Sequence, residues 1–175
     1  MAISKTLIGN KIRLIPFSES HLTDHYINWL NDPMVVKFSE QRHVAHSKQT
    51  CRQYWESFSN SPNYFWAIET MCDNPEHIGN SNAYLDLKNG IADLGILIGH
   101  SGLWGKGYGL DAWNTAMNYL LSLPEIRKVT AGTMENNLSM LKIFSKSGMQ
   151  EDGKRSKHFM YENKAIDLIH FAKFK

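Results

Sequence analysis

Three glycines at alternate positions give this chain its clearest chemical signal. Gly105, Gly107 and Gly109 surround Lys106 and precede an amphipathic helical segment. Such a turn lets successive backbone N–H groups point into one concavity, and the positive end of the following helix adds to the attraction for anions. The pattern indicates a phosphate site, although three glycines can also form a simple tight connection between a strand and a helix.

Two other phosphate-binding motifs overlap these residues, and their context disfavours both. The run Gly107–Ala112 fits the G-x-G-x-x-A dinucleotide fingerprint, but only about 60 residues follow it, too few for a doubly wound domain. Lys106 is followed by Gly107 rather than by the Ser or Thr with which a Walker A loop binds magnesium. The first match keeps a nucleotide-binding oxidoreductase among the alternatives.

The elements that must position this turn predict a mixed α/β sheet. Alternating apolar and polar residues, bounded by turn residues, predict about seven strands. Their ranges are Lys11–Phe17, Tyr64–Glu69, Ile78–Leu87, Ile91–Ile98, Lys128–Thr133, Lys157–Tyr161 and Ile166–Phe174. Helical spacing predicts about four helices, which begin at Ser18, near Ser47, after Gly109 and at Asn137. At 175 residues the chain suits a single domain, 1–175.

Composition narrows the functional classes. With 19 lysines and arginines against 17 acidic residues, the charge bias is too small to favour nucleic acid or a membrane surface. Cys51 and Cys72 lack the spacing of a zinc site or disulfide framework, and no leader or membrane span is evident, so a cytoplasmic location is expected. His21 and His25 stand four residues apart without a third ligand, so we predict a surface pair and no metal.

Two sequence blocks, taken together, resemble a known family. Leu103–Ala112 (LWGKGYGLDA) is similar to the acetyl-CoA signature Q/R-x-x-G-x-G/A of GNAT acetyltransferases, with Trp104 in place of Gln or Arg, which removes one polar side chain near the phosphates. Asn136–Met149 resembles the family's N-x-x-[A/S/M]-x-x-[L/V]-[Y/L/F]-x-K-x-G-F helix, in which Asn137 reaches the pantetheine arm and also suits an N-cap. The branch resembled acetylates ribosomal-protein N-termini or amino sugars.

The resemblance implies a fold, a cofactor and a reaction. The expected fold is a GNAT fold, α/β, with a mostly antiparallel central sheet opened near the acetyl-CoA site. Backbone N–H groups from about Leu97 to Gly99 would meet the pantetheine and the carbonyl oxygen. An amine would attack acetyl-CoA directly. The implied cofactor-binding residues are Leu97, Ile98, Gly99, Trp104, Gly105, Lys106, Gly107, Tyr108, Gly109, Asn137, Phe144 and Lys146.

The resemblance also suggests a general base. Asp93 occupies a strand position where many family members carry a carboxylate that acts directly or through water. A solvent-facing residue paired with a lysine is an equal alternative, and Glu69 and His100 are further options for the base.

A general acid is harder to assign. Phe144 stands where many relatives have a tyrosine acid, so the leaving thiolate would take its proton from water, from the hydroxyl of Ser139 or Ser145, or from no group at all. A thiol ionises not far above neutral pH, so the loss is tolerable. A non-catalytic module that binds acyl-CoA therefore stays open as an alternative.

The N-terminal third resembles the acceptor side of the family. Trp29, Tyr84 and Trp66 are aromatic candidates for contact with the acceptor, although all can be core residues. Arg42 could face an anionic acceptor such as a sugar nucleotide, or could be an ordinary solvated arginine. The acceptor itself stays open among peptide N-termini, amino-sugar nucleotides, polyamines and aminoglycosides. The oligomeric state is open too, a homodimer included.

Overall fold

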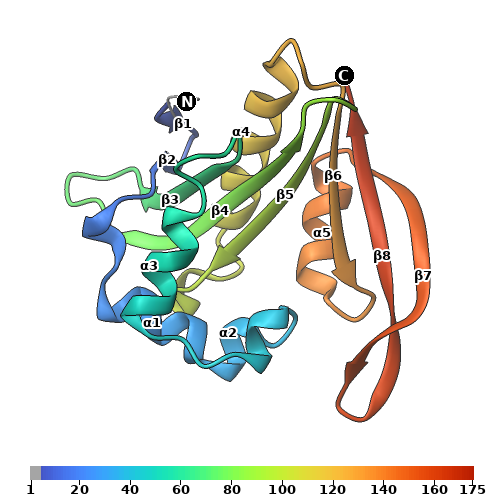
Figure 1. The fold of residues 1–175 in the computed structure, drawn as a ribbon, viewed down its shortest axis with the longest axis horizontal. Helices are drawn as coiled ribbons and strands as arrows, with labels where there is room; N and C mark the ends of the chain where they lie inside the picture. Colours follow the sequence, from blue (N-terminus) through green and yellow to red (C-terminus); the bar gives the residue numbers. More distant parts are fainter. Residues whose placement is uncertain (1–4) are drawn as a thin grey trace.

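A single mixed sheet runs through the computed structural model, which describes residues 5–175 (Figure 1). Its eight strands, in spatial order, are β1 (Leu7–Ile8), β2 (Ile12–Pro16), β3 (Tyr64–Thr70), β4 (His77–Asp86), β5 (Ile91–Ile98), β6 (Lys128–Met134), β8 (Lys164–Phe174) and β7 (Gln150–Tyr161). All neighbours are antiparallel except β5 and β6. The predicted mixed, mostly antiparallel sheet is confirmed, and residues 1–4 of the predicted domain lie outside the described residues.

The strands differ from the prediction at the two ends of the sheet. β1 has two residues, too few to show an alternating pattern. β7 begins at Gln150, seven residues before the predicted start. Its residues are nearly all exposed, and its pairing with β8 shifts register at two points, so no period of two marks it in the sequence.

The helices within the described residues are α1 (Asp24–Asn31), α2 (Pro33–Val36), α3 (Lys48–Glu56), α4 (Tyr108–Ser122) and α5 (Leu138–Lys146). Ser47 and Asn137 are N-caps, as predicted. Ser18 instead caps a single 3₁₀ turn, Glu19–His21, and α1 starts only after Thr23, whose hydroxyl accepts the Tyr26 N–H at 3.3 Å. Two further 3₁₀ turns are Glu40–His43 and Ser101–Leu103.

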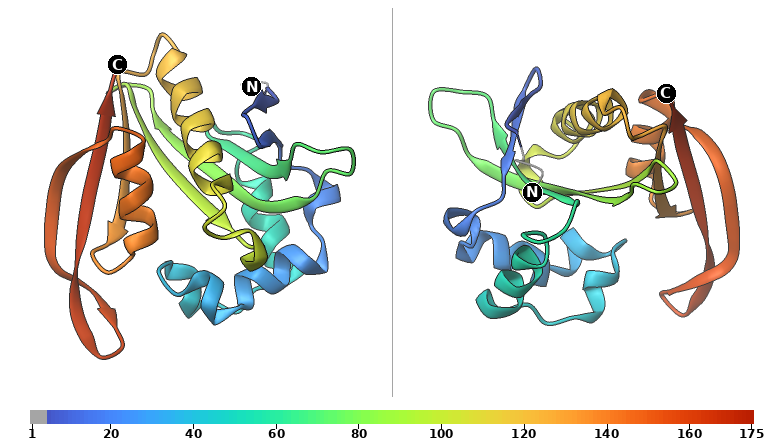
Figure 2. Two further views of the ribbon diagram at one scale, coloured as in Figure 1. Left: turned by 180° about the vertical axis from the view of Figure 1, so that it is seen from behind. Right: turned by 45° about the horizontal axis from the view of Figure 1, so that its top comes forward.

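The helices cover both faces of the sheet (Figure 2). α4 and α5 cover one face, where Trp66, Trp113 and Phe144 lie in the larger buried cluster. α1 and α3 cover the other face, where Phe17, Tyr26 and Phe65 belong to a second cluster. β3 is buried on both sides because its alternate side chains enter the two clusters. The sheet therefore separates two compartments.

The sheet opens between β5 and β6. β5 and β6 pair only over Ile91–Asp93 and Lys128–Thr130. Beyond Asp93, β5 continues to Ile98 paired with β4 alone, and β6 continues to Met134 paired with β8 alone. The two strands diverge from their common start in Figure 1. The facing edges of β5 and β6 thus lack strand partners where the resemblance predicted an open sheet.

Candidate active site

The glycine turn has the backbone geometry that its residues suggested. Gly105 and Gly107 have φ of +75° and +89°, which side-chain-bearing residues rarely adopt, and Gly107 is the N-cap of α4. A Cβ at Gly105 would find no atom within 4 Å, so this side of the turn is open. The first N–H groups of α4 have no partner within the helix. The turn and the helix start together can hold an anionic group.

A lysine from the start of the chain joins this turn. The Lys11 ammonium donates to the Lys106 carbonyl at 3.0 Å and lies 5.6 Å from the centre of the Tyr108 ring. The Asp111 carboxylate holds it there by accepting the N–H groups of Lys11 at 2.7 Å and Ile12 at 3.2 Å. Lys11 thus adds positive charge beside the turn. The sequence analysis missed it because the two partners lie 95 residues apart.

Trp104 connects the turn to the end of β5. Its indole N–H donates to the Ile98 carbonyl at 2.8 Å, while 43% of the side chain remains exposed. From the resemblance, Trp104 was expected only to remove a polar side chain near the phosphates. The structure instead shows a donor that ties the glycine turn to the unpaired edge of the sheet.

The N–H groups on that edge alternate in direction. The Gly99 N–H donates to the Ile78 carbonyl at 2.9 Å, so it is occupied within the chain. Leu97 pairs with Asn80 of β4, and the ladder directs its N–H the same way. The N–H groups of Ile96 and Ile98 therefore point toward the opening. Within the expected range of Leu97 to Gly99, only the Ile98 N–H points toward the opening, and Ile96 adds a second N–H outside that range.

Trp29 packs directly on the end of β5. A Cβ at Gly99 would lie 2.0 Å from Trp29 Cδ2, so only glycine lets the indole approach this closely. The Trp29 ring also lies 5.2 Å from His77, at an angle of 67°. Trp29 was expected to contact the acceptor, but it does not line the cavity described next. It buttresses the strand end.

A half-open cavity of about 390 Å³ lies on the α1 and α3 side of the sheet, against the unpaired stretch of β5; we call it the inner cavity. It shares Leu30, Gln41 and Val44 with an outer groove of about 630 Å³, which extends to the tip of the β7–β8 hairpin. The inner cavity is lined by Tyr26, Leu30, Ser39, Gln41, Val44, His46, Thr50, Cys51, Tyr54, Asn80, Asn82, Gly95, Ile96 and Leu97. The glycine turn and this cavity thus reach β5 from opposite faces.

Asp93 stands where the β5–β6 ladder ends. Its carboxylate accepts the Thr130 hydroxyl at 2.9 Å across the two strands. Asp93 is exposed by its surface area, yet the protein packed around its carboxylate raises its pKa above the ordinary value, while the Thr130 hydrogen bond and nearby His170 act in the opposite direction. No salt bridge between Asp93 and a lysine occurs in the described residues. Tyr84, its pairing partner on β4, hydrogen-bonds Tyr54 at 3.0 Å.

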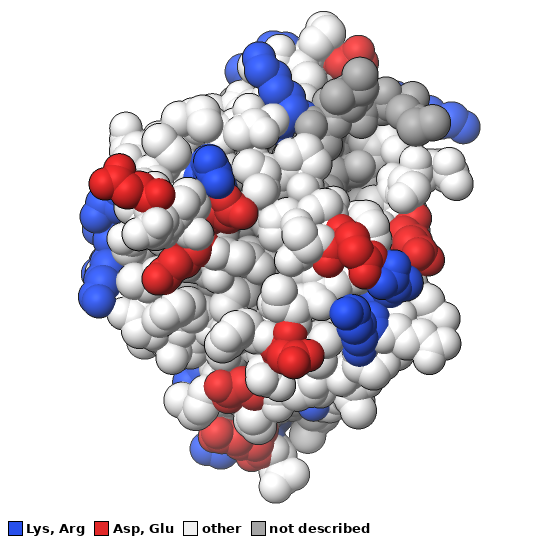
Figure 3. Space-filling view, turned by 90° about the vertical axis from the view of Figure 1, so that its left-hand side faces the viewer, with Lys and Arg blue, Asp and Glu red and all other residues white. Residues whose placement is uncertain are grey.

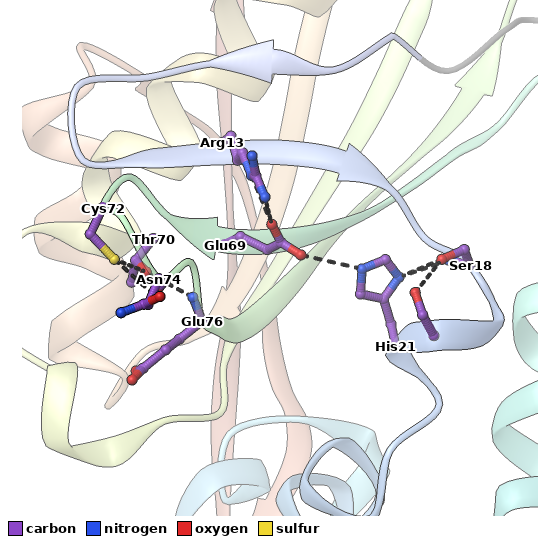
Figure 4. A network of polar contacts seen from close by, with 9 residues as sticks. Arg13, Ser18, His21, Glu69, Thr70, Cys72, Asn74 and Glu76 are labelled. Atoms are coloured by element: carbon purple, nitrogen blue, oxygen red, sulfur yellow. Dashed lines mark hydrogen bonds and ion pairs between the residues drawn. The ribbon is translucent and has the colours of Figure 1, made fainter.

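Glu69, a further candidate for the base, is committed to another network (Figure 4). It accepts from Arg13 Nη2 at 2.6 Å and lies 3.6 Å from His21 Nε2. The Ser18 N–H donates to the other ring nitrogen of His21 at 2.9 Å. His21 is buried and His25 is exposed, so the predicted surface pair is wrong. The third candidate for the base, His100, is exposed beside the glycine turn.

Arg42 holds the β7–β8 hairpin rather than facing the inner cavity. Its guanidinium pairs with Glu40 at 2.8 Å and donates to the carbonyls of Ser39 at 3.0 Å and Met160 at 3.3 Å. Only 14% of its side chain is exposed, so it is not a solvated arginine either. It lines the outer groove.

The second sequence block forms α5, as expected, but its residues differ in their exposure to solvent. The Asn137 amide accepts the Met140 N–H at 3.3 Å and donates to the Thr133 hydroxyl at 3.0 Å. Ser139 and Lys146 are exposed. Phe144 is fully buried between Trp113 and Phe171, so its side chain offers no surface to a cofactor. Trp66 is also fully buried, in the cluster on the α4 face.

Charge and metal-ligating groups are dispersed. Basic and acidic side chains are interspersed on the side of the molecule that Figure 3 shows. Within residues 5–175, no three His, Cys, Asp or Glu side chains are grouped to hold a metal ion. None of the described helices is long and apolar enough to span a bilayer.

Comparisons with known proteins place the chain in a family. A family model described as an acetyltransferase (GNAT) domain matches residues 11–150. An N-acetyltransferase 9-like protein of Nematostella vectensis is 23% identical over 151 residues, which cover 81% of this chain and 76% of that protein. The uncharacterized protein MJ1062 of Methanocaldococcus jannaschii is 26% identical over 136 residues, 77% of this chain, and the chain spans only 27% of its length.

The solved structures share the fold. The ribosomal L7/L12 alpha-N-protein acetyltransferase RimL, in complex with coenzyme A, superposes with a TM-score of 0.84. It covers 97% of this chain and 98% of its own, at 14% identity, so this likeness concerns the fold alone. Since the family model covers most of the chain, this protein belongs to the GNAT family, as an acetyl-CoA-dependent N-acetyltransferase that transfers an acetyl group to an amine.

Proposed function

We propose that donor and acceptor meet at the unpaired edge of β5, each from its own face of the sheet. The observation that carries this proposal is the end of the β5–β6 ladder at Asp93 and Thr130, with the glycine turn on one side and the inner cavity on the other. The turn from Gly105 to Gly109, with Lys11 beside it, would hold the pyrophosphate. The acceptor amine would occupy the inner cavity.

The chain's own groups supply what the transfer needs. The amine nitrogen forms a bond to the acetyl carbon while the carbon–sulfur bond breaks and the thiolate leaves. The Ile96 and Ile98 N–H groups point toward the opening, where they can stabilise the negative charge that develops on the carbonyl oxygen. Phe144 carries no proton to donate, so we propose that solvent, or the exposed Ser139 hydroxyl, protonates the thiolate.

Asp93 is the proposed base. The amine must lose a proton as it attacks, and a carboxylate with a raised pKa accepts a proton near neutral pH more readily than an ordinary one. Asp93 lies at the start of the opening rather than among the residues that line the inner cavity, so we propose transfer through a bridging water. The Thr130 hydroxyl orients the carboxylate.

Three further features complete this proposal. We propose a cytoplasmic location, which is supported by the two free thiols, Cys51 buried and Cys72 exposed. Catalysis without a metal and a homodimeric state are also proposals. The acceptor classes that the resemblance implies, a protein N-terminus and an amino-sugar nucleotide, are proposals as well.

The test measures binding and transfer separately. Calorimetry with acetyl-CoA reports binding, and release of free CoA thiol with a panel of primary amines reports transfer. We expect both, with a rate proportional to protein concentration, and loss of rate but not of binding in Asp93→Asn. Tight binding without thiol release for every amine would instead support the non-catalytic module. Preferential binding of NAD(H) would revive the oxidoreductase.

A further inference from the structure

We propose that the acceptor is an amino sugar, with its ring held in the inner cavity. This inference rests on the function proposed above and names its substrate class. Two unpartnered polar atoms in the cavity wall point to it. Asn80 is only 8% exposed, and its Oδ1 atom is buried without a hydrogen-bond partner. The Nε2 atom of His46 is likewise buried and unpartnered, and both residues line the same cavity.

Such atoms are costly to keep. A buried polar group without a partner loses its hydration and gains nothing in return, so native proteins satisfy nearly all of them. Of the eight such atoms in the described residues, only these two belong to side chains that line a cavity, where a ligand can supply the missing partners. The carbonyl oxygen of an asparagine can only accept, so the ligand must offer at least one donor at Asn80.

The rest of the wall matches a ring that carries several hydroxyl groups. The amides of Gln41 and Asn82 can both donate and accept. The hydroxyls of Ser39, Thr50 and Tyr54 already bond Gln41, Ser47 and Tyr84, and each keeps a lone pair that can accept. Sugar hydroxyls likewise both donate and accept. The apolar part of the lining, which includes Tyr26, Val44 and Leu97, suits the C–H faces of a ring.

The lining disfavours two other acceptors. A polyamine carries a second positive charge, which needs a buried carboxylate as its partner. Neither Asp nor Glu occurs among the described residues that line the inner cavity. An extended peptide presents one N–H donor per residue, whereas a sugar ring presents several hydroxyls around one compact body. Asn31, which lines the outer groove, fixes the backbone of His46 by bonding both its N–H and its carbonyl, each at 2.9 Å.

The amino sugar could be free or attached to a nucleotide. The outer groove continues from the inner cavity and carries Lys37 and His43, with Glu162 as its one carboxylate among the described lining residues. The experiment therefore includes both forms. With acetyl-CoA and the purified chain, kcat/KM is measured for 2-, 3- and 4-amino hexoses, for their nucleoside-diphosphate-linked forms, for short peptides with free N-termini and for spermidine.

We expect at least one amino sugar, free or nucleotide-linked, to exceed spermidine and every peptide by about 100-fold or more in kcat/KM, because a site built for hydroxyl groups rejects ligands that leave its polar atoms unpaired. A nucleotide-linked form that is preferred over the free sugar would assign the outer groove to the nucleotide. Equal or better transfer to spermidine or to a peptide overturns this inference but leaves acetyl transfer intact. Transfer to no amine, with acetyl-CoA bound, overturns the proposed function itself.

Variants test the two wall atoms. Asn80→Leu should keep or raise Tm, because it removes an unsatisfied buried group, and should leave acetyl-CoA binding unchanged. It should raise KM for the amino sugar by about tenfold or more. Asn28→Leu, at an exposed site on α1, is the matched control and should leave acetyl-CoA binding and KM for the amino sugar unchanged. His46→Phe gives a second test if Asn80→Leu folds poorly. An unchanged KM in both cavity variants would refute the assignment.

Discussion

His77 makes the stability of this fold sensitive to mild acid. It begins β4, and its ring centre lies 5.1 Å from that of His21 and 5.2 Å from that of Trp29. Both ring nitrogens are buried and lack hydrogen-bond partners. Burial, helped by the neighbouring His21 charge, lowers the pKa of His77 from 6.5 to about 4, while the Gly79 backbone and Glu69 oppose the change only in part. His77 therefore binds a proton more weakly in the folded chain than in the unfolded chain.

The sign and size follow from proton linkage. Because the pKa is lower in the folded state, the contribution of neutral His77 is fully present above pH 6.5 and is lost as the pH falls toward 4. At about 1.4 kcal/mol per pH unit, the whole fall costs about 3 kcal/mol. Between pH 7 and pH 5 the loss is about 2 kcal/mol, a large share of the stability of a typical domain.

Urea unfolding at pH 7, 6 and 5 measures this loss. His77→Phe keeps an aromatic ring among Phe17, Tyr26 and Trp29 but cannot take a proton, so about 2 kcal/mol of the acid sensitivity should disappear. His25→Phe, at an exposed site on α1, should behave as wild type. The reasoning is refuted if wild type and His77→Phe lose equal stability between pH 7 and pH 5.

Three further predictions concern the reaction. Trp104→Phe removes the hydrogen-bond donor to Ile98, which is worth about 1 kcal/mol, so KM for acetyl-CoA should rise about fivefold while KM for the amine stays unchanged. Trp104→Gln keeps a donor, so its KM for acetyl-CoA should rise less. An equal rise in the two variants would count against the hydrogen bond. Gly107→Ala forces a side chain into φ +89° and should weaken acetyl-CoA binding about tenfold in calorimetry, whereas Gly153→Ala, in exposed β7 at φ +145°, should not. Asp93→Asn should slow transfer at pH 7 by about 100-fold or more. The wild-type rate should fall as the pH drops through a pKa that lies above the ordinary carboxyl range. If Asp93→Asn shows the same decrease in rate at low pH, Asp93 is not the base.

Local signals predicted the central elements well. The bounds of β5, Ile91–Ile98, match the prediction because turn residues flank an apolar run on both sides. The positive φ of Gly105 and Gly107 was foreseeable because only glycine adopts it readily, and the cap at Asn137 because its side chain bonds within the next turn. Each of these features is decided within about ten residues of chain.

The failures share a different cause, which is contact between distant segments. The sequence around Lys11 does not predict its contact with the glycine turn, and the sequence around His21 does not predict its contact with Glu69. Each pair meets only when the sheet is formed. Phe144 resembled a position facing the cofactor, yet its ring lies in the core because the α5 face that carries it packs on Trp113 and Phe171. The inner cavity was not predicted at all, because its lining comes from helices, loops and two strands.

The order of elements along the chain has an evolutionary consequence. The non-strand part of the inner cavity wall comes from one uninterrupted segment between β2 and β3, whereas the glycine turn and α5 come after β5. Under the proposed placement of the two substrates, changes within that early segment can redirect the enzyme to another amine while the proposed acetyl-CoA site stays as it is. Trp29 is the exception, because it rests on Gly99 at the strand end. Lineages can therefore diverge in acceptor through one stretch of sequence, provided that this one contact is kept.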